Sequence, residues 1–303
     1  MNAWIAAGGS PERLALYQQL ATVRTFAEGP SRCLAAIHPA LPDVGAIGDW
    51  RGSDAVRLQA EAWLAERGAT VARGPMEVCT WFPYRANLGP HDERTFSLEP
   101  TEPVHRWLHA GYAPAAHYST AEVAHDALLT RAERAREQLA PLGWRVEPLR
   151  ADEGAHLSRA RYDELIVEVH RLSMLAFADA YAFAPIPLGA LAALYEPLRE
   201  RLDPTLVFLV YAPDGRVVGF LFCLVDAGPP QRLLLKSLAL EREARGLGLS
   251  WWLIGAAHAT AASRGMPHAL HCLRHEDSVS MRLHAHQERV IRRYALLEKS
   301  LLS

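Results

Sequence analysis

The hydrophobic and polar positions follow their clearest pattern in the second half of the chain. Apolar residues there recur either at helical spacing or in short runs of strand length, and glycine or proline separates the segments. The elements predicted, in chain order, are a strand at 144–149, a helix at 162–177, a helix at 188–202 that is interrupted near Pro197, strands at 205–211, 217–225 and 232–240, a helix at 249–265, a strand at 268–273, a short helix at 277–286 and a strand at 290–297. We expect a mixed α/β fold with a largely antiparallel sheet.

The first half has a weaker pattern of the same kind. The elements predicted there are a helix at 11–26, strands at 33–37 and 44–50, a helix at 55–67, a strand at 70–78, a polar loop at 84–102, a short helix at 103–110, a strand within 112–124 and an amphipathic helix at 121–139. Pro141-Leu142-Gly143 follows that helix, and we place a domain boundary there, between residues 1–142 and 143–303.

Composition and charge exclude several classes of function. A net charge of −2 and a pI of about 6.7 argue against a nucleic-acid partner. No apolar stretch reaches the length of a membrane span and no signal peptide precedes the first helix, so we expect a cytoplasmic protein with no membrane partner. The four cysteines form no C-x-x-C pair, and the spacing of the C-terminal histidines matches no zinc signature, so we expect no metal.

The turn between the strand 232–240 and the helix 249–265 is the first candidate for chemistry. It contains Arg245-Gly246-Leu247-Gly248, and Leu249 and Ser250 follow in the first helical turn without a carboxylate. Glycine allows a sharp turn in which several amide N–H groups point at one anion, and the helix dipole adds partial positive charge there. The pattern is typical of a phosphate site, although a lone G-x-G also occurs in ordinary strand-to-helix turns.

The order of elements around this turn resembles the GNAT superfamily of acyl-CoA-dependent N-acyltransferases, over residues 143–301. In that family a turn of the form Q/R-x-x-G-x-G/A binds the pyrophosphate of coenzyme A. Residues 243–248 read Glu-Ala-Arg-Gly-Leu-Gly, so both glycines match and Glu243 departs from the pattern. The resemblance implies that the cofactor contacts run through the turn and the strand before it, at Leu238, Leu240, Arg245, Gly246, Leu247, Gly248, Leu249 and Ser250.

A second feature of the family is an Asn followed by a small residue at +3 and a Tyr at +7, on the helix after the fifth strand. Asp277, Ser280 and His284 occupy these positions, and the resemblance implies that Asp277 and Ser280 contact the cofactor. The family Tyr often protonates the departing thiolate, and an imidazole at His284 is able to do the same because it titrates near neutral pH. His284 is equally well read as a surface histidine, with His275 and His286 nearby.

The first half repeats the strand–turn–helix–strand order more faintly. Its turn, Arg51-Gly52-Ser53-Asp54, lacks the second glycine, and Asp54 places a carboxylate where a phosphate would lie. The whole chain therefore resembles a tandem GNAT protein whose N-terminal GNAT-like domain has lost cofactor binding, each domain having a mixed, mostly antiparallel sheet flanked by helices.

The resemblance implies acyl transfer, most simply acetyl, from acetyl-CoA or another acyl-CoA to a primary amine of a small molecule. Glu241 is the first candidate for the general base, Glu243 the second, and the backbone from Leu238 to Leu240 is the candidate oxyanion site. The alternatives are transfer from an acyl carrier protein and a GNAT-like protein that binds acyl-CoA or a partner without turnover. The acceptor and the oligomeric state, monomer or homodimer, stay open.

Overall fold

The protein is described from a computed structural model, which covers residues 2–89, 94–277 and 288–302. The strands of its sheet are β1 (Thr22–Glu28), β2 (Ser31–Ile37), β3 (Val44–Arg51), β4 (Val71–Gly74), β5 (Ala86–Asn87), β6 (Ala113–Ala124), β7 (Arg145–Pro148), β8 (Val207–Tyr211), β9 (Val217–Asp226), β10 (Arg232–Leu240), β11 (His268–His275) and β12 (Glu288–Ser300). All belong to one twisted sheet, whose order is β1-β2-β3-β4-β12-β6-β11-β10-β9-β8-β7, with β5 paired to β12.

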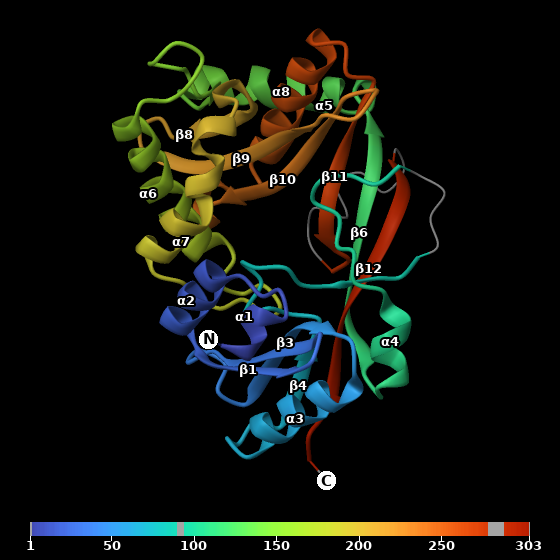
Figure 1. Cartoon of the computed structure of the whole chain (residues 1–303). Coiled ribbons are helices and arrows are strands. Elements are labelled where there is room, and N and C mark those ends of the chain that lie inside the picture. Colours follow the sequence, from blue (N-terminus) through green and yellow to red (C-terminus); the bar gives the residue numbers. More distant parts are fainter. Residues whose placement is uncertain (1, 90–93, 278–287, 303) are drawn as a thin grey trace.

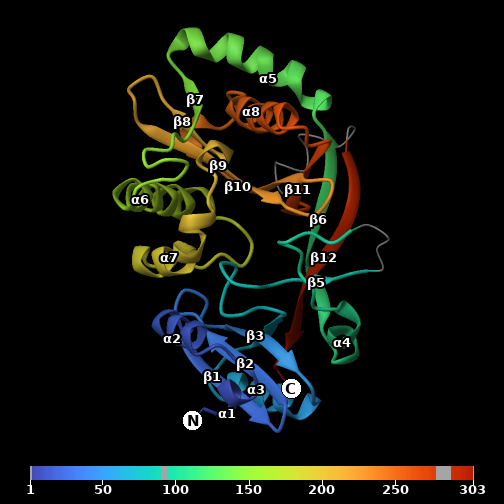
Figure 2. The same cartoon turned by 45° about the horizontal axis from the view of Figure 1, so that its top comes forward.

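The helices cover both faces of this sheet. They are α1 (Ala3–Ala6), α2 (Pro11–Leu20), α3 (Asp54–Ala65), α4 (Val104–His109), α5 (Asp126–Leu139), α6 (Arg159–Ala176), α7 (Leu188–Tyr195) and α8 (Leu249–Ser263), with short 3-10 turns at Ala140–Leu142, Glu196–Arg201, Pro204–Leu206 and Arg242–Ala244. Over the strands β8 to β10, α5 and α8 lie on one face of the sheet and α6 and α7 on the other (Figure 2). No helix among the described residues is long and apolar enough to cross a membrane.

Two long strands join the halves. β6, which precedes the expected boundary at 142, pairs with β11 of the second half, and β12 at the C-terminal end pairs with both β6 and β4. Figure 1 shows them running between the two halves, so that each part of the sheet is completed by a strand from the other. Residues 1–142 and 143–303 therefore contribute strands to one continuous sheet. Our proposal of two GNAT-like units rests on the order of elements that the two parts of the chain repeat.

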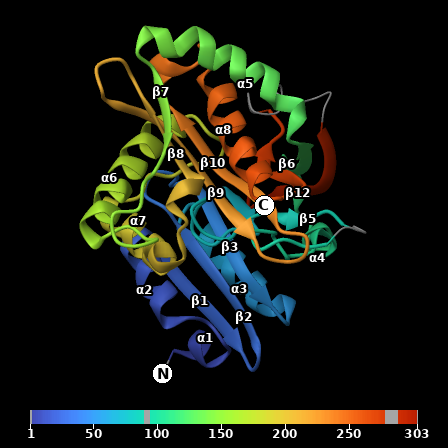
Figure 3. The same cartoon turned by 90° about the horizontal axis from the view of Figure 1, so that it is seen from above.

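Three apolar clusters hold these layers together. One lies under α5 and α8, one under α3 and α4, and the largest is shared by α2, α6, α7 and both parts of the sheet. Figure 3 shows α5 running beside α8 over β8 to β10. The two helices approach so closely that a Cβ at Gly255 would lie 2.1 Å from the Cβ of Ala132, and glycine makes this contact possible.

The second half follows the predicted elements with end shifts of a few residues, apart from the predicted helix 277–286, most of which falls outside the described residues. The prediction of one helix over 11–26 is wrong in its second part. The helix stops at Leu20, and β1 follows because Thr22–Glu28 pairs in register with Ser31–Ile37 as a hairpin. Val23 and Phe26 fit a helical spacing, but pairing with β2 decides the local structure.

Candidate functional site

The turn after β10 is built on two glycines in the left-handed region. Gly246 has φ +79° and Gly248, the N-cap of α8, has φ +102°. A Cβ at Gly246 would meet no atom of the described residues within 4 Å, so the turn is open on that side in the described part of the chain. The two positive φ values reverse the chain between the end of β10 and the start of α8 without a Cβ penalty.

This turn exposes a row of amide donors. Ala244 and Arg245 donate to the carbonyls of Glu241 and Arg242, and Trp251 and Trp252 donate to the Gly248 carbonyl. Between them, the amide N–H groups from Gly246 to Ser250 donate to no acceptor within the described residues. A helix start carries partial positive charge, so this row suits a phosphate or pyrophosphate group.

β10 and β11 separate beside the turn. Their parallel pairing is limited to Leu233–Leu235 with Ala269–His271, and a bulge at Lys236 then bends β10. Leu238 and Leu240 stay paired to β9, while the edge of β10 that faces β11 has no register partner among the described residues. The split therefore leaves backbone polar groups of β10 near Leu238 available to a ligand, as the oxyanion hypothesis requires.

A cavity of about 570 Å³ lies at the inner side of this split, between the two halves. We call it the central cavity. Its lining comes from β3 at Gly48–Arg51, from the segments 75–85 and 97–102, and from Lys236, Ser237 and Leu273 of β10 and β11. A ligand held at the β10 split thus faces a chamber whose far wall belongs to the first half.

Strained backbone clusters in the walls of the central cavity. Asp49, Arg85 and Leu273 line it with φ values of +45°, +85° and +55°, a conformation that non-glycine residues rarely adopt. Val78, next to the lining residue Glu77, has φ +69°. Such conformations persist only where the surrounding structure imposes them, and they concentrate at binding and catalytic sites.

Glu77 is a carboxylate of the cavity lining whose acidity is altered by its surroundings. Burial raises its pKa above the usual range, and a hydrogen bond from the Tyr17 hydroxyl and an ion pair with Arg13 at 2.9 Å only partly oppose this. A carboxylate with a raised pKa that faces a cavity is suited to accept a proton near neutral pH.

Comparison with known proteins agrees with this geometry. Residues 167–287 match the acetyltransferase (GNAT) family. The chain carries a GNAT domain. Curated protein sequences contain no significant match to it.

Solved structures extend the likeness to the whole chain at the level of the fold. A GCN5-related N-acetyltransferase from Sphaerobacter thermophilus is 14% identical with a TM-score of 0.51, over 99% of this chain and 89% of that one. A tandem GNAT protein from the clavulanic acid biosynthesis pathway is 13% identical with a TM-score of 0.51, over 99% and 93%. A glucosamine N-acetyltransferase region of a fungal multi-domain β-N-acetylglucosaminidase is 12% identical with a TM-score of 0.54; it aligns with 95% of this chain, which spans only 34% of that protein.

Several predicted contact residues of the GNAT domain do come together at its glycine turn. Gly246, Leu247, Gly248 and Ser250 lie at the start of α8, while Leu249 is fully buried, so only its backbone faces the turn. Arg245 stands beside them, but its guanidinium donates to the carbonyls of Leu240 and Ala176, both at 3.0 Å. Arg245 therefore ties the ends of β10 and α6 together as well as placing positive charge near the turn.

Glu241 has a different environment from the one that a general base needs. Its carboxylate accepts hydrogen bonds from Arg171 at 2.5 Å and from Arg216 at 2.6 Å. These two guanidinium groups outweigh burial and hold the pKa of Glu241 below its usual range. The geometry disfavours Glu241 as the base, because a carboxylate stabilised in this way is a weak proton acceptor. Its ion pairs instead fix the start of the turn to α6 and β9.

The predicted residues after β11 are only partly visible. Asp277 is exposed in a turn, and its amide donates to the His275 imidazole at 3.3 Å. Ser280 and His284 lie outside the described residues, so their predicted roles stay predictions. His275, treated above as a neighbour of His284, lies between the rings of Tyr118 and Tyr181, with centroids 5.0 and 6.1 Å away.

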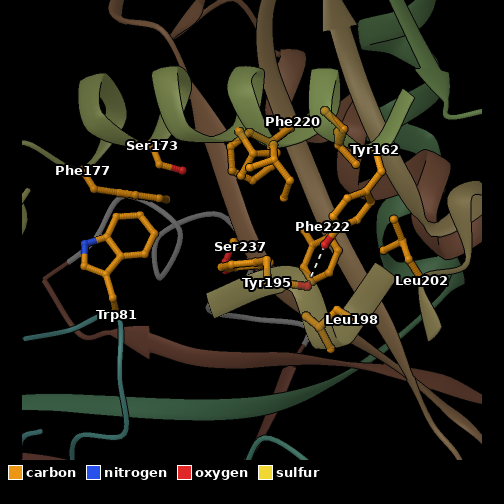
Figure 4. A pocket seen from close by; sticks show the side chains of 13 residues that line it. Trp81, Tyr162, Ser173, Phe177, Tyr195, Leu198, Leu202, Phe220, Phe222 and Ser237 are labelled. Atoms are coloured by element: carbon orange, nitrogen blue, oxygen red, sulfur yellow. Dashed lines mark hydrogen bonds between the residues drawn. The ribbon is translucent and has the colours of Figure 1, made fainter. Parts of the chain in front are cut away.

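A smaller apolar pocket of about 30 Å³ adjoins the central cavity (Figure 4). Phe220 and Phe222 of β9 form its floor, α6 contributes Ser173, and Trp81 and Ser237 line both the pocket and the cavity. Sequence reasoning missed Glu77, Trp81 and Arg85, because the segment 75–85 carries no motif. Apolar residues on both sides of Glu77 were the available signal that its carboxylate is buried.

Proposed function

We propose that this chain is an N-acyltransferase that moves a short acyl group, most simply acetyl, from acyl-CoA to an amine bound in the central cavity. The observation that carries the proposal is the row of amide N–H groups from Gly246 to Ser250, which have no protein acceptor in the described structure and lie beside the split between β10 and β11.

The residues present fit the pyrophosphate of coenzyme A. An open glycine turn lets the backbone approach an anion, and no carboxylate occupies the first turn of α8. Acyl-CoA, when bound, supplies the activated thioester. The edge of β10 near Leu238 donates to the oxygen that becomes negatively charged during transfer. The small apolar pocket at Phe220 and Phe222 favours a short acyl chain, because its volume of about 30 Å³ has room for a small group.

The acceptor amine must lose a proton before it attacks a thioester. Glu77 replaces Glu241 as our candidate for this step, acting directly or through a water molecule, because it faces the central cavity and its pKa is raised. Taking up the amine proton leaves Glu77 neutral and the amine nitrogen with a lone pair for the carbonyl carbon. As the C–N bond forms, the C–S bond of the thioester breaks and the coenzyme A thiolate leaves, and His284 stays our predicted donor of the proton that the thiolate takes up.

Calorimetric titration with acetyl-CoA tests the cofactor site, with Gly246→Glu as the disrupting variant. Gly265→Glu is a matched control, because Gly265 also has a positive φ, of +74°, and open space around it, but lies at the other end of α8. We expect one site per chain in the wild type and in Gly265→Glu, and none in Gly246→Glu. Equal binding by the two variants would overturn the assignment of the turn, and two sites per chain would show that the first half also binds.

A further inference from the structure

The charges that line the central cavity do not balance within the protein. Every lining carboxylate has an arginine partner: Asp49 with Arg32, Glu77 with Arg13, Glu99 with Arg292 and Glu102 with Arg51. Two of the cations that line the cavity, Arg13 and Arg51, are neutralised by these ion pairs. Arg85 and Lys236 also line the cavity, and neither forms an ion pair with any described residue.

Arg85 is held in place without a counter-charge. Its guanidinium carbon lies 3.7 Å from the centroid of the Tyr84 ring and 4.2 Å from that of Tyr118, two rings that stand almost perpendicular to each other, at an interplanar angle of 87°. It also donates to the Tyr84 hydroxyl, while its buried Nε has no hydrogen-bond partner in the described structure. A buried guanidinium donor left unsatisfied is costly unless a ligand completes it.

The backbone shows that this position is imposed rather than relaxed. Arg85 has φ +85°, and its amide donates to the Pro75 carbonyl at 3.1 Å, across a narrow hairpin closed by the bridge between Met76 and Tyr84. The hairpin thus holds the Arg85 guanidinium at the wall of the cavity. A guanidinium is a planar group whose donors match the two oxygens of a carboxylate or phosphate.

Lys236 supplies a second cation, on the wall that β10 contributes. It lies at the bulge of β10, and its ammonium donates to the Tyr195 hydroxyl at 2.8 Å and lies 5.1 Å from the centroid of that ring. These contacts hold the ammonium between β10 and α7 while leaving its charge uncompensated. The cavity therefore offers positive charge both at the split of β10 and at the wall from the first half.

We propose that the central cavity binds an acceptor that carries an anionic group, a carboxylate or a phosphate, with the Arg85 guanidinium as its main binding partner. That this ligand is the acyl acceptor rests on the proposed acyltransferase function, whereas the anion site itself does not. Arg85 fixes the anionic end, and the amine end is then free to reach the acyl group at the β10 split. Lys236 raises the positive potential of the cavity and so attracts the same anion at longer range.

Matched probe pairs test this without an acyl donor. β-Alanine is compared with β-alaninamide, and phosphoethanolamine with ethanolamine, by calorimetric titration of the full chain. We expect one anionic member to bind roughly tenfold to a hundredfold tighter than its neutral partner, as one charge-assisted bidentate contact predicts. The pair that shows the larger preference identifies the anion as carboxylate or phosphate. An absent preference in both pairs would overturn the proposal.

Variants assign the preference to Arg85. Arg85→Leu should abolish it, and Arg85→Lys should restore part of it, because an ammonium keeps the charge but not the fork. Arg67→Leu is the control: its guanidinium also stacks on an aromatic ring, at 4.2 Å from the Trp63 centroid, but it does not line the cavity. An unchanged preference in Arg85→Leu would refute the role of Arg85. Melting curves establish that each variant is folded, and Lys236→Met, expected to weaken the preference less, gives a second readout if Arg85→Leu does not fold.

Acetyl-CoA titration of the same samples separates the two proposals. If Arg85→Leu binds acetyl-CoA normally and loses the anion preference, both stand. If the wild type shows an Arg85-dependent anion preference but does not bind acetyl-CoA, the acyltransferase proposal fails and the anion site remains. If acetyl-CoA binds and no anion preference exists, only the present inference fails.

Discussion

The two strand–turn–helix units of the molecule, β3–α3 and β10–α8, begin from the same backbone plan and end in opposite states. At β10–α8 the N-cap is a glycine with no side-chain cap, and the amides around it have no protein acceptor in the described structure. At β3–α3 the N-cap is Ser53, whose hydroxyl accepts from the Ala55 amide at 3.1 Å, and Asp54 follows with a carboxylate in the first turn. The turn between β3 and α3, which we call the first turn, is therefore capped by its own side chains. The turn between β10 and α8 is the second turn.

The space beside the first turn is also occupied. Arg106 donates to the carbonyls of Trp50 and Gly52, and Trp107 packs edge-on against Trp50 with ring centroids 5.3 Å apart. A Cβ at Gly74 would lie 2.1 Å from the Trp107 ring, so the aromatic group fills the region where β3 and β4 part. The comparison favours one cofactor site per chain. It also suggests that the first half, having closed its own turn, contributes walls of the central cavity.

The strongest way to break this comparison is to remove the side chain that closes the first turn. Trp107 is fully buried and touches Trp50 and Tyr112, so Trp107→Ala should lower the free energy of unfolding by about 3–5 kcal/mol. Urea unfolding measures the change. Acetyl-CoA binding at the second turn should persist in the folded variant. A loss well below 1 kcal/mol would mean that the first turn is not closed by packing, and it would reopen the possibility of a second ligand site.

Glu77 and Glu241, the two carboxylates considered as the general base, provide the test with the next largest expected effect, on the rate of acyl transfer. With Glu77 as base, kcat/KM should fall as the pH drops through its raised pKa, because the protonated carboxyl cannot accept a proton. Glu77→Gln should lower kcat/KM by roughly 100-fold at neutral pH and flatten that acidic limb. Glu241→Gln is the control, since the lowered pKa of Glu241 places its titration at more acidic pH. Acyl transfer is followed by thiol release across pH. A flattened limb in Glu241→Gln and not in Glu77→Gln would reverse the assignment.

What could be predicted from the sequence follows the range of the interactions involved. The glycine turn is local, so Arg245-Gly246-Leu247-Gly248 was enough to locate it, and the apolar periods of the second half were enough for its helices and strands. β1 was missed, although Gly29-Pro30 marks the turn after it, because helix and strand periods overlap in a short run. The pairing of β6 and β12 across the halves has no local signal, because it depends on which edges the complete sheet leaves open.

The chemistry of the site depended more on distant partners. Glu241 looked like a base because it ends a strand near the turn, but its acidity is set by Arg171 on α6 and Arg216 near β9, far away in sequence. Glu77 and Arg85 lie in a connecting segment, and only the folded hairpin places them in a cavity with the β10 bulge. The pKa of a group at a site depends on all the charged groups that the fold brings near it. A sequence pattern therefore locates the backbone of such a site more reliably than it identifies the residues that act as acid and base.

The smallest change that sharpens the comparison is to give the second turn the carboxylate that the first one has. Ser250 is in the first turn of α8, so Ser250→Asp should stabilise the helix by about 0.3–1 kcal/mol, through its dipole. The same carboxylate should repel a pyrophosphate on the adjacent amides and raise the Kd for acetyl-CoA about tenfold, about 1.4 kcal/mol. In Ser250→Asp, thermal unfolding should therefore show a higher melting temperature, and calorimetry should show weaker binding of acetyl-CoA.

Ser250→Asn separates charge from shape in that experiment, because its amide is nearly isosteric with the carboxylate and carries no charge. It should leave acetyl-CoA binding within about twofold of the wild type, since the effect assigned to Asp is electrostatic. Raising the salt concentration should narrow the gap between the Asp and Asn variants, because the turn is exposed to solvent. If Ser250→Asp bound acetyl-CoA as tightly as Ser250→Asn at low salt, the amides of α8 would not be the pyrophosphate site. The open turn would then differ from the closed one in structure but not in function.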